Sequence, residues 1–153
     1  MTRVIVRNTQ RKVSLSIQAI ERESRKALRT LGVKDAELSI LFASPQKVRS
    51  LNHQYRGIDK TTDVLSFAVH DLGGKPPFRR PEGEEEFLLG DIVINPRRAE
   101  EQAKEYEVTL KTEIRRLIVH GLLHLLGYDH EAGAYQARKM VKKEEEVLEA
   151  INA

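Results

Sequence analysis

The sequence contains no cysteine and no tryptophan, and aromatic residues make up only 5% of its 153 residues. The absence of cysteine excludes disulfide bonds and thiolate metal sites, so any transition metal must bind to nitrogen and oxygen ligands. No apolar run approaches the ~20 residues of a membrane span, and the N-terminal residues lack the apolar core of a signal peptide. We therefore expect a cytoplasmic protein without a membrane partner.

Neither sign of charge dominates the chain. Lys and Arg total 26 against 23 Asp and Glu, for a formal net charge of +3, which favours a nucleic-acid partner only weakly. Basic residues gather in the N-terminal part, whereas acidic residues cluster at 82–86, 100–101 and 144–146. A charged helix is also what an ordinary solvated surface requires. Charge alone therefore leaves both interpretations open.

Hydrophobic periodicity and capping residues predict a single α+β domain over residues 1–153, in which about five helices pack on one mixed sheet of about four short strands. Ser14 is the expected N-cap of the first helix, and Ser44 and Asn95 each precede a proline that suits the first helical position. We expect strands at 4–8, 37–43, 63–69 and 87–94, and helices at about 14–31, 45–55, 96–106, 110–126 and 132–151.

Residues 71–86 separate the last two expected strands. Glycine, proline and mixed charge predict a mobile loop rather than a regular element. Its length is too great for a simple hairpin, so it is either a lid or substrate-guiding loop, or an insertion that the surface tolerates.

The segment from His120 to His130 contains three of the five histidines. His120 and His124 are four residues apart and project from the same face of the expected helix over 110–126, which we expect to lie across the sheet. Gly127 can take a positive φ and end that helix, so that His130 can return to the same place. Three imidazoles with one open position are the ligand set of a catalytic zinc ion. We expect one Zn²⁺ per chain, although another divalent metal would also fit.

A glutamate is missing beside the first histidine. In metzincin proteases, which share this histidine spacing, the residue after the first ligand is a glutamate that acts as general base, but here it is Gly121. The nearest carboxylates flank the third histidine instead. The sequence thus predicts a zinc hydrolase site without the base of a protease.

Four blocks in order along the chain resemble the YbeY family of bacterial metal-dependent endoribonucleases. They are Asn52-x-x-Tyr55-Arg56-x-x-Asp59, Thr62-Asp63-Val64-Leu65-Ser66-Phe67, Leu89-Gly90-Asp91-Ile92 and the segment from His120 to His130. The resemblance implies a small α+β fold and a zinc ion held by His120, His124 and His130. It also implies cleavage of single-stranded RNA, 3′-end maturation of 16S ribosomal RNA and ribosome quality control, with the small ribosomal subunit and its proteins as partners.

Arg56 is the expected second cation, because a guanidinium matches phosphate oxygens at two points and a zinc ion with three neutral ligands suits an anionic phosphodiester. We expect Arg56 and His124 to be catalytic, and Arg56, Tyr55 and Asp63 to contact substrate. The sequence leaves open whether the metal alone or the substrate phosphate deprotonates the attacking water, or whether the RNA 2′-hydroxyl attacks. Two other functions stay open as well: a ribosome-assembly factor with little nuclease activity, and a zinc hydrolase of another substrate class, such as a peptidase.

Overall fold

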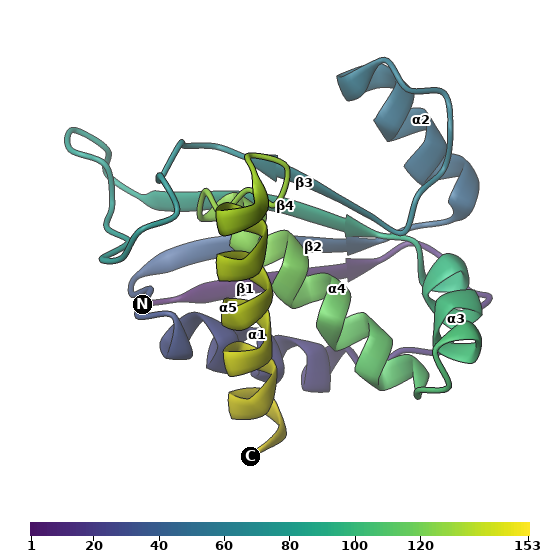
Figure 1. Ribbon diagram of the computed structural model, residues 1–153. Coiled ribbons are helices and arrows are strands. Elements are labelled where there is room, and N and C mark those ends of the chain that lie inside the picture. Colours follow the sequence, from purple (N-terminus) through teal and green to yellow (C-terminus); the bar gives the residue numbers. More distant parts are fainter.

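A four-stranded mixed sheet forms the centre of the computed structural model, which describes residues 1–153 (Figure 1). The spatial order is β1-β2-β4-β3, with β1 parallel to β2, β2 parallel to β4, and β3 antiparallel to β4. The mixed sheet confirms the predicted fold class. The strands are β1 (Arg3–Asn8), β2 (Ala36–Phe42), β3 (Val64–Ala68) and β4 (Phe87–Ile94).

Five helices surround this sheet, as the sequence predicts. Figure 1 shows α1, α4 and α5 on one side of the sheet and α2 on the other. The helix that carries the first two histidines, α4, contacts both β3 and β4 and so lies across the sheet. The helices are α1 (Ile17–Thr30), α2 (Pro45–Arg56), α3 (Pro96–Glu105), α4 (Leu110–Leu125) and α5 (Ala134–Asn152).

The predicted caps are confirmed at two helices and wrong at one. Ser44 and Asn95 accept hydrogen bonds from the backbone N–H groups of Lys47 and Arg98, each at 3.2 Å. The first helix, however, is capped by Ser16 rather than Ser14, because its hydroxyl accepts from the Ala19 N–H. Both serines have the chemistry of a cap. Leu15 packs against the core, and the helix therefore begins after Leu15, with Ser16 as its cap.

The main core lies between the sheet and the helices on its first side, and it contains 28 buried residues. Alternate residues of β2 point into it, and the apolar face of α4 supplies its largest group of side chains. Each fully buried Leu or Ile contributes roughly 1.5–3 kcal/mol of transfer free energy. This packing fixes the rotation of α4 about its axis, so its histidines emerge beside the β3 edge of the sheet.

A smaller cluster attaches α2 to the opposite side of β3. Val48 of α2 packs with Leu65 and Val93, whereas the alternate strand residues Val64 and Ser66 face the side of α4. The end of α2 is therefore held close to the β3 edge, where Arg56 can reach around it. No helix of the structure has both the length and the hydrophobicity that crossing a membrane would require.

The segment between β3 and β4, expected as a mobile loop over 71–86, has two anchors in the structure. Phe78 is buried in the main core with its ring centroid 6.1 Å from that of Tyr128, and Gly74 donates a backbone hydrogen bond of 2.9 Å to Leu126. Tyr128 is thus a core residue. The mobility of the remaining loop residues stays a prediction.

Candidate metal centre

The helix α4 places His120 and His124 on one face, one turn apart. Thr109 caps its N-terminus by accepting the Thr112 N–H at 3.1 Å, and the buried leucines of its apolar face hold it against the sheet. The two imidazoles consequently point in the same direction, and their Nε2 atoms are 3.1 Å apart. This is the arrangement that the four-residue spacing predicts.

A tight turn brings His130 back to the same point. Gly127 has a φ of +95° and donates a hydrogen bond of 3.0 Å to the His124 carbonyl, which ends the helix. Glycine is required there, because a β-carbon at this position would lie 2.6 Å from the backbone nitrogens of Gly73 and Gly74. The anchored start of the β3–β4 segment and the histidine turn thus hold each other in place.

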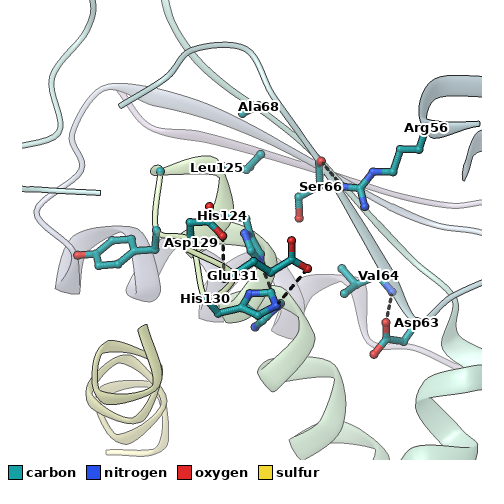
Figure 2. A pocket seen from close by; sticks show the side chains of 13 residues that line it. Arg56, Asp63, Val64, Ser66, Ala68, His124, Leu125, Asp129, His130 and Glu131 are labelled. Carbon is teal, nitrogen blue, oxygen red and sulfur yellow. Dashed lines mark hydrogen bonds and ion pairs between the residues drawn. The ribbon is translucent and has the colours of Figure 1, made fainter. Parts of the chain in front are cut away.

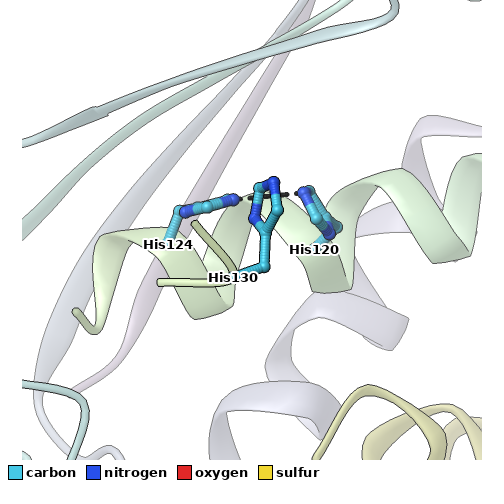
Figure 3. A group of neighbouring side chains, drawn as sticks. All are labelled: His120, His124 and His130. Atoms are coloured by element: carbon cyan, nitrogen blue, oxygen red, sulfur yellow. Dashed lines mark hydrogen bonds between the residues drawn. The ribbon is translucent and has the colours of Figure 1, made fainter. Parts of the chain in front are cut away.

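Figure 3 shows the three rings converging on one point from the helix and the following turn. One ring nitrogen from each of His120, His124 and His130 lies within 4.8 Å of the other two, close enough to share a metal ion. The rings are partly buried or exposed at the surface of the pocket, so an ion bound there would remain accessible to solvent and substrate. Three nitrogen donors with space beside them suit zinc or a similar divalent ion.

The pKa of His124 also fits a metal site. Burial lowers the pKa of His124, and the neighbouring His120 and His130 lower it further because two cationic rings would repel a third. The neutral ring, which has the free lone pair that a metal needs, is therefore favoured near neutral pH.

A pocket of about 660 Å³ opens beside the histidines. Figure 2 shows the histidine turn on one side of it and the β3 edge with Arg56 on the other. The β3 side contributes Val64, Ser66 and Ala68, which alternate along the strand and face the same way. The turn side contributes Asp129 and Glu131 in addition to the rings. The pocket therefore has a potential metal at one wall and a cation at the opposite one.

Arg56 reaches the pocket from the last residue of α2. Its Nη2 donates a hydrogen bond of 3.3 Å to the Ser66 carbonyl, and its guanidinium lies 6.0 Å from the centroid of the Phe67 ring. No carboxylate pairs with it, whereas Arg49 on the same helix forms an ion pair of 2.8 Å with Asp59. The guanidinium is thus oriented by β3 and keeps donors free for an anion.

Asp63 lies at the pocket wall and is the end of a hydrogen-bond network. Its carboxylate accepts from the Val64 N–H at 2.7 Å and from Gln102 Nε2 at 3.2 Å. Gln102 also donates to Glu113, which is buried and pairs with Arg116 at 2.7 Å. The network joins the start of β3 to α3 and α4, so it fixes the strand relative to the helix that carries His120.

Tyr55 does not line the pocket, although the sequence suggests it as a substrate contact. Its ring is largely exposed and lies 5.4 Å from the Phe67 ring, on the side of β3 away from the histidines. His53 and His70 do not line the pocket either. The structure thus brings Arg56, Asp63 and the three histidines together and leaves Tyr55 beside them.

The position that holds the general base in metzincins faces the sheet in this structure. A β-carbon on Gly121 would lie 3.0 Å from Ile92 Cγ2 and 3.1 Å from Ser66 Oγ. A glutamate side chain would have to displace both residues. The packing of α4 on the sheet therefore explains why the protease base is missing.

Glu144 of α5 contacts the site, although it lies outside the four blocks that resemble the family. Its Oε1 lies 2.5 Å from His120 Nδ1. It belongs to the acidic cluster at 144–146, which has the composition of an ordinary charged surface. The sequence does contain a signal for its position, because Glu144 has helical spacing with the apolar residues Met140, Val147 and Ile151. All three are buried in the structure, so Glu144 lies on the face of α5 that packs on the core.

The sequence and the fold of this chain are each similar to those of known proteins. The model of the family described as "Endoribonuclease YbeY" matches residues 5–152. A protein of that name from Pelotomaculum thermopropionicum is 44% identical over 153 residues, which covers 97% of each chain. Another of the same name from Aquifex aeolicus is 42% identical and covers 98% of this chain and 92% of its own. A Thermotoga maritima protein solved in solution has a TM-score of 0.65 at 25% identity, covering 97% of this chain and 88% of its own.

Proposed function

The chain belongs to the YbeY family of endoribonucleases, and from this membership we propose that it cleaves single-stranded RNA with a zinc ion held by His120, His124 and His130. The observation that carries the proposal is the convergence of three imidazole nitrogens opposite an unpaired arginine in one pocket. This combination suits a phosphodiester, which needs positive charge at more than one oxygen during cleavage.

The metal, when bound, supplies a Lewis acid that can acidify water and offset negative charge on a phosphate oxygen. The three histidines bind it as neutral donors, so its positive charge is not reduced by a carboxylate ligand. Each imidazole must present a lone pair to the pocket, and the lowered pKa of His124 favours this state.

Arg56 is proposed to bind the phosphate from the other wall of the pocket. Its hydrogen bond to the Ser66 carbonyl orients the guanidinium while other N–H groups stay available for phosphate oxygens. Asp63 is proposed to support the substrate-binding wall through its network and to contact polar groups of the RNA. Tyr55 is proposed to stack on a base beyond the pocket, because its exposed ring lies next to Phe67.

The proposal does not choose the group that accepts the proton of the attacking water or 2′-hydroxyl. Gly121 supplies no base, and the carboxylates at the pocket are those of Asp63, Asp129 and Glu131. A route in which the RNA 2′-hydroxyl attacks requires ribose and leaves a cyclic phosphate. The end group of the RNA product, a cyclic phosphate or not, therefore distinguishes this route from attack by water.

The biological substrate that we propose is the 3′ end of 16S ribosomal RNA, with the small ribosomal subunit and its proteins as partners and a further role in ribosome quality control. Family membership supports this proposal. Ribosome maturation would also place the protein in the cytoplasm.

The proposed activity is tested by incubating zinc-loaded protein with single-stranded RNA, duplex RNA and single-stranded DNA of the same sequence. We expect internal cleavage of the single-stranded RNA and much slower cleavage of the duplex. Equal cleavage of DNA and RNA would contradict an endoribonuclease. Stoichiometric zinc without cleavage of any free nucleic acid would favour the assembly-factor alternative, and binding to small ribosomal subunits would then be measured.

A further inference from the structure

His120 has a different partner at each of its two ring nitrogens. Its Nε2 faces the Nε2 of His124 at 3.1 Å, on the side where the three rings converge. Its Nδ1 lies 2.5 Å from Oε1 of Glu144, which comes from α5. The two side chains are only 25% and 16% exposed, so water competes weakly for this contact.

The placement of Glu144 is unusual for the helix that carries it. Met140 lies four residues before Glu144, Val147 three residues after it and Ile151 seven residues after it. All three of these apolar residues are buried in the main core. Glu144 is therefore a carboxylate within the apolar face of α5. A carboxylate in such a position loses hydration and needs a compensating donor. His120 Nδ1 is the donor that the structure provides.

The two neighbouring glutamates do not share this environment. Glu145 and Glu146 are both exposed, and Glu146 pairs with Lys143 at 3.0 Å on the surface. Three consecutive glutamates thus differ sharply in surroundings, and only Glu144 contacts a histidine of the site.

The contact determines the tautomer of His120. A neutral imidazole carries one N–H, and Glu144 can only accept a hydrogen bond when it is ionised, so the proton belongs on Nδ1. The lone pair is then on Nε2, which faces the metal-binding point. We infer that Glu144 is a positioning residue, which holds the His120 ring and its tautomer ready for the metal and makes the ring a stronger donor.

Neither of the other histidines has an equivalent partner. The only carboxylate within 4.0 Å of a His130 ring nitrogen is that of Glu131, at 3.9 Å from Nε2, which is too long for a hydrogen bond. His124 has no carboxylate contact. Of the three rings, only that of His120 is oriented by a carboxylate, and this orientation depends through Glu144 on the docking of α5 against α4.

Metal affinity tests this inference, which rests on the metal site of the proposed function. Zinc affinity is measured by competition with a chromophoric chelator in the wild type, Glu144→Ala, Glu144→Gln and Glu145→Ala. The last variant removes the same charge from the next position of the same helix. Substitution of a carboxylate that supports a metal-bound histidine typically weakens metal binding by about 10–100-fold. We expect a loss of this size in Glu144→Ala and wild-type affinity in Glu145→Ala.

Glu144→Gln distinguishes a role in positioning the His120 ring from a role in folding. Its amide oxygen can still accept the Nδ1 hydrogen bond without the charge, so its zinc affinity should lie between those of the wild type and Glu144→Ala. The visible spectrum of the Co²⁺-substituted protein should change in the same order, since it reports the ligand field rather than stability.

The outcomes distinguish the inference from the proposed function. Equal zinc affinity in Glu144→Ala and Glu145→Ala, with an unchanged Co²⁺ spectrum, would overturn the role of Glu144 and leave the metal site intact. A wild-type protein that binds neither metal would overturn both.

Discussion

Gly121 of α4 packs directly against Ser66 of β3, so that a β-carbon on the glycine would lie 3.1 Å from the serine Oγ. The same β-carbon would lie 3.0 Å from Ile92 Cγ2. The distance between the histidine helix and the sheet, and hence the depth of the pocket between them, is therefore set by a residue without a side chain.

Gly121→Glu is predicted to destabilise the fold by about 3 kcal/mol, because it overpacks this contact and buries a carboxylate without a partner. In Gly121→Ala, the helix propensity gained, about 1 kcal/mol, should offset most of the crowding. Urea denaturation of the metal-free proteins measures both changes. A glutamate variant as stable as the wild type would show that the site has room for the base of a protease.

Gly127→Ala is predicted to weaken zinc binding as well as stability. Its φ of +95° disfavours alanine, and the added carbon would collide with Gly73 and Gly74 at 2.6 Å, which displaces His130. Gly83 is a matched control because its φ is +89° but nothing lies within 4 Å. Gly83→Ala should cost about 1–2 kcal/mol of stability through its φ alone.

Chelator competition and denaturation of the two glycine variants measure the difference. Gly127→Ala should lose more than about 1.4 kcal/mol of zinc-binding free energy, a tenfold effect. Gly83→Ala should bind zinc like the wild type. Equal zinc affinity in both variants would mean that the turn does not position His130.

Arg56→Glu is predicted to reduce RNA cleavage by at least about 10²-fold, the usual cost of removing a group that stabilises charge in the transition state. Zinc content should stay unchanged, because Arg56 contacts Ser66 and Phe67 rather than the histidines. Arg49→Glu makes the same charge change on the same helix but removes only an exposed pair with Asp59, which contributes little. Cleavage close to the wild-type rate is expected for this control.

Metal analysis and cleavage rates of the two arginine variants decide between two roles. Loss of zinc in Arg56→Glu would make the arginine structural. Similar loss of cleavage in both variants would indicate a general effect of surface charge on RNA binding.

Removal of the metal is predicted to abolish cleavage while the fold persists, since none of the three histidines belongs to the buried core. Far-UV circular dichroism should be unchanged by a chelator, and thermal unfolding should occur at a lower temperature. Free zinc at 100 times its dissociation constant would stabilise the fold by about 2.7 kcal/mol. Unfolding on chelation would instead identify a structural metal.

Much of the site was predictable because its determinants are local. The spacing of His120 and His124 follows from one helical turn, and Gly127 is required by a single backbone angle, so the sequence predicts their convergence with His130. The mixed sheet and its elements were also predicted. The Ser14 cap was wrong because two serines compete for the same role and the packing of Leu15 decides between them.

The remaining features depend on contacts between elements that are far apart in the sequence. Glu144 is 24 residues from His120, and its role depends on how α5 docks on α4. Tyr55 adjoins Arg56 in sequence, yet only the arginine lines the pocket, because the end of α2 directs neighbouring residues to different sides of β3. The buried Glu113 network likewise joins three elements.

The most direct test of the proposal that the chain is a metal-dependent endoribonuclease compares zinc content and cleavage of single-stranded RNA in the wild type, His124→Ala and His53→Ala. His53 is an exposed histidine outside the pocket and controls for the loss of an imidazole. The wild type and His53→Ala should each hold one zinc ion and cut RNA, whereas His124→Ala should lose both properties together. RNA cleavage that persists in zinc-free His124→Ala would contradict a catalytic metal at these histidines.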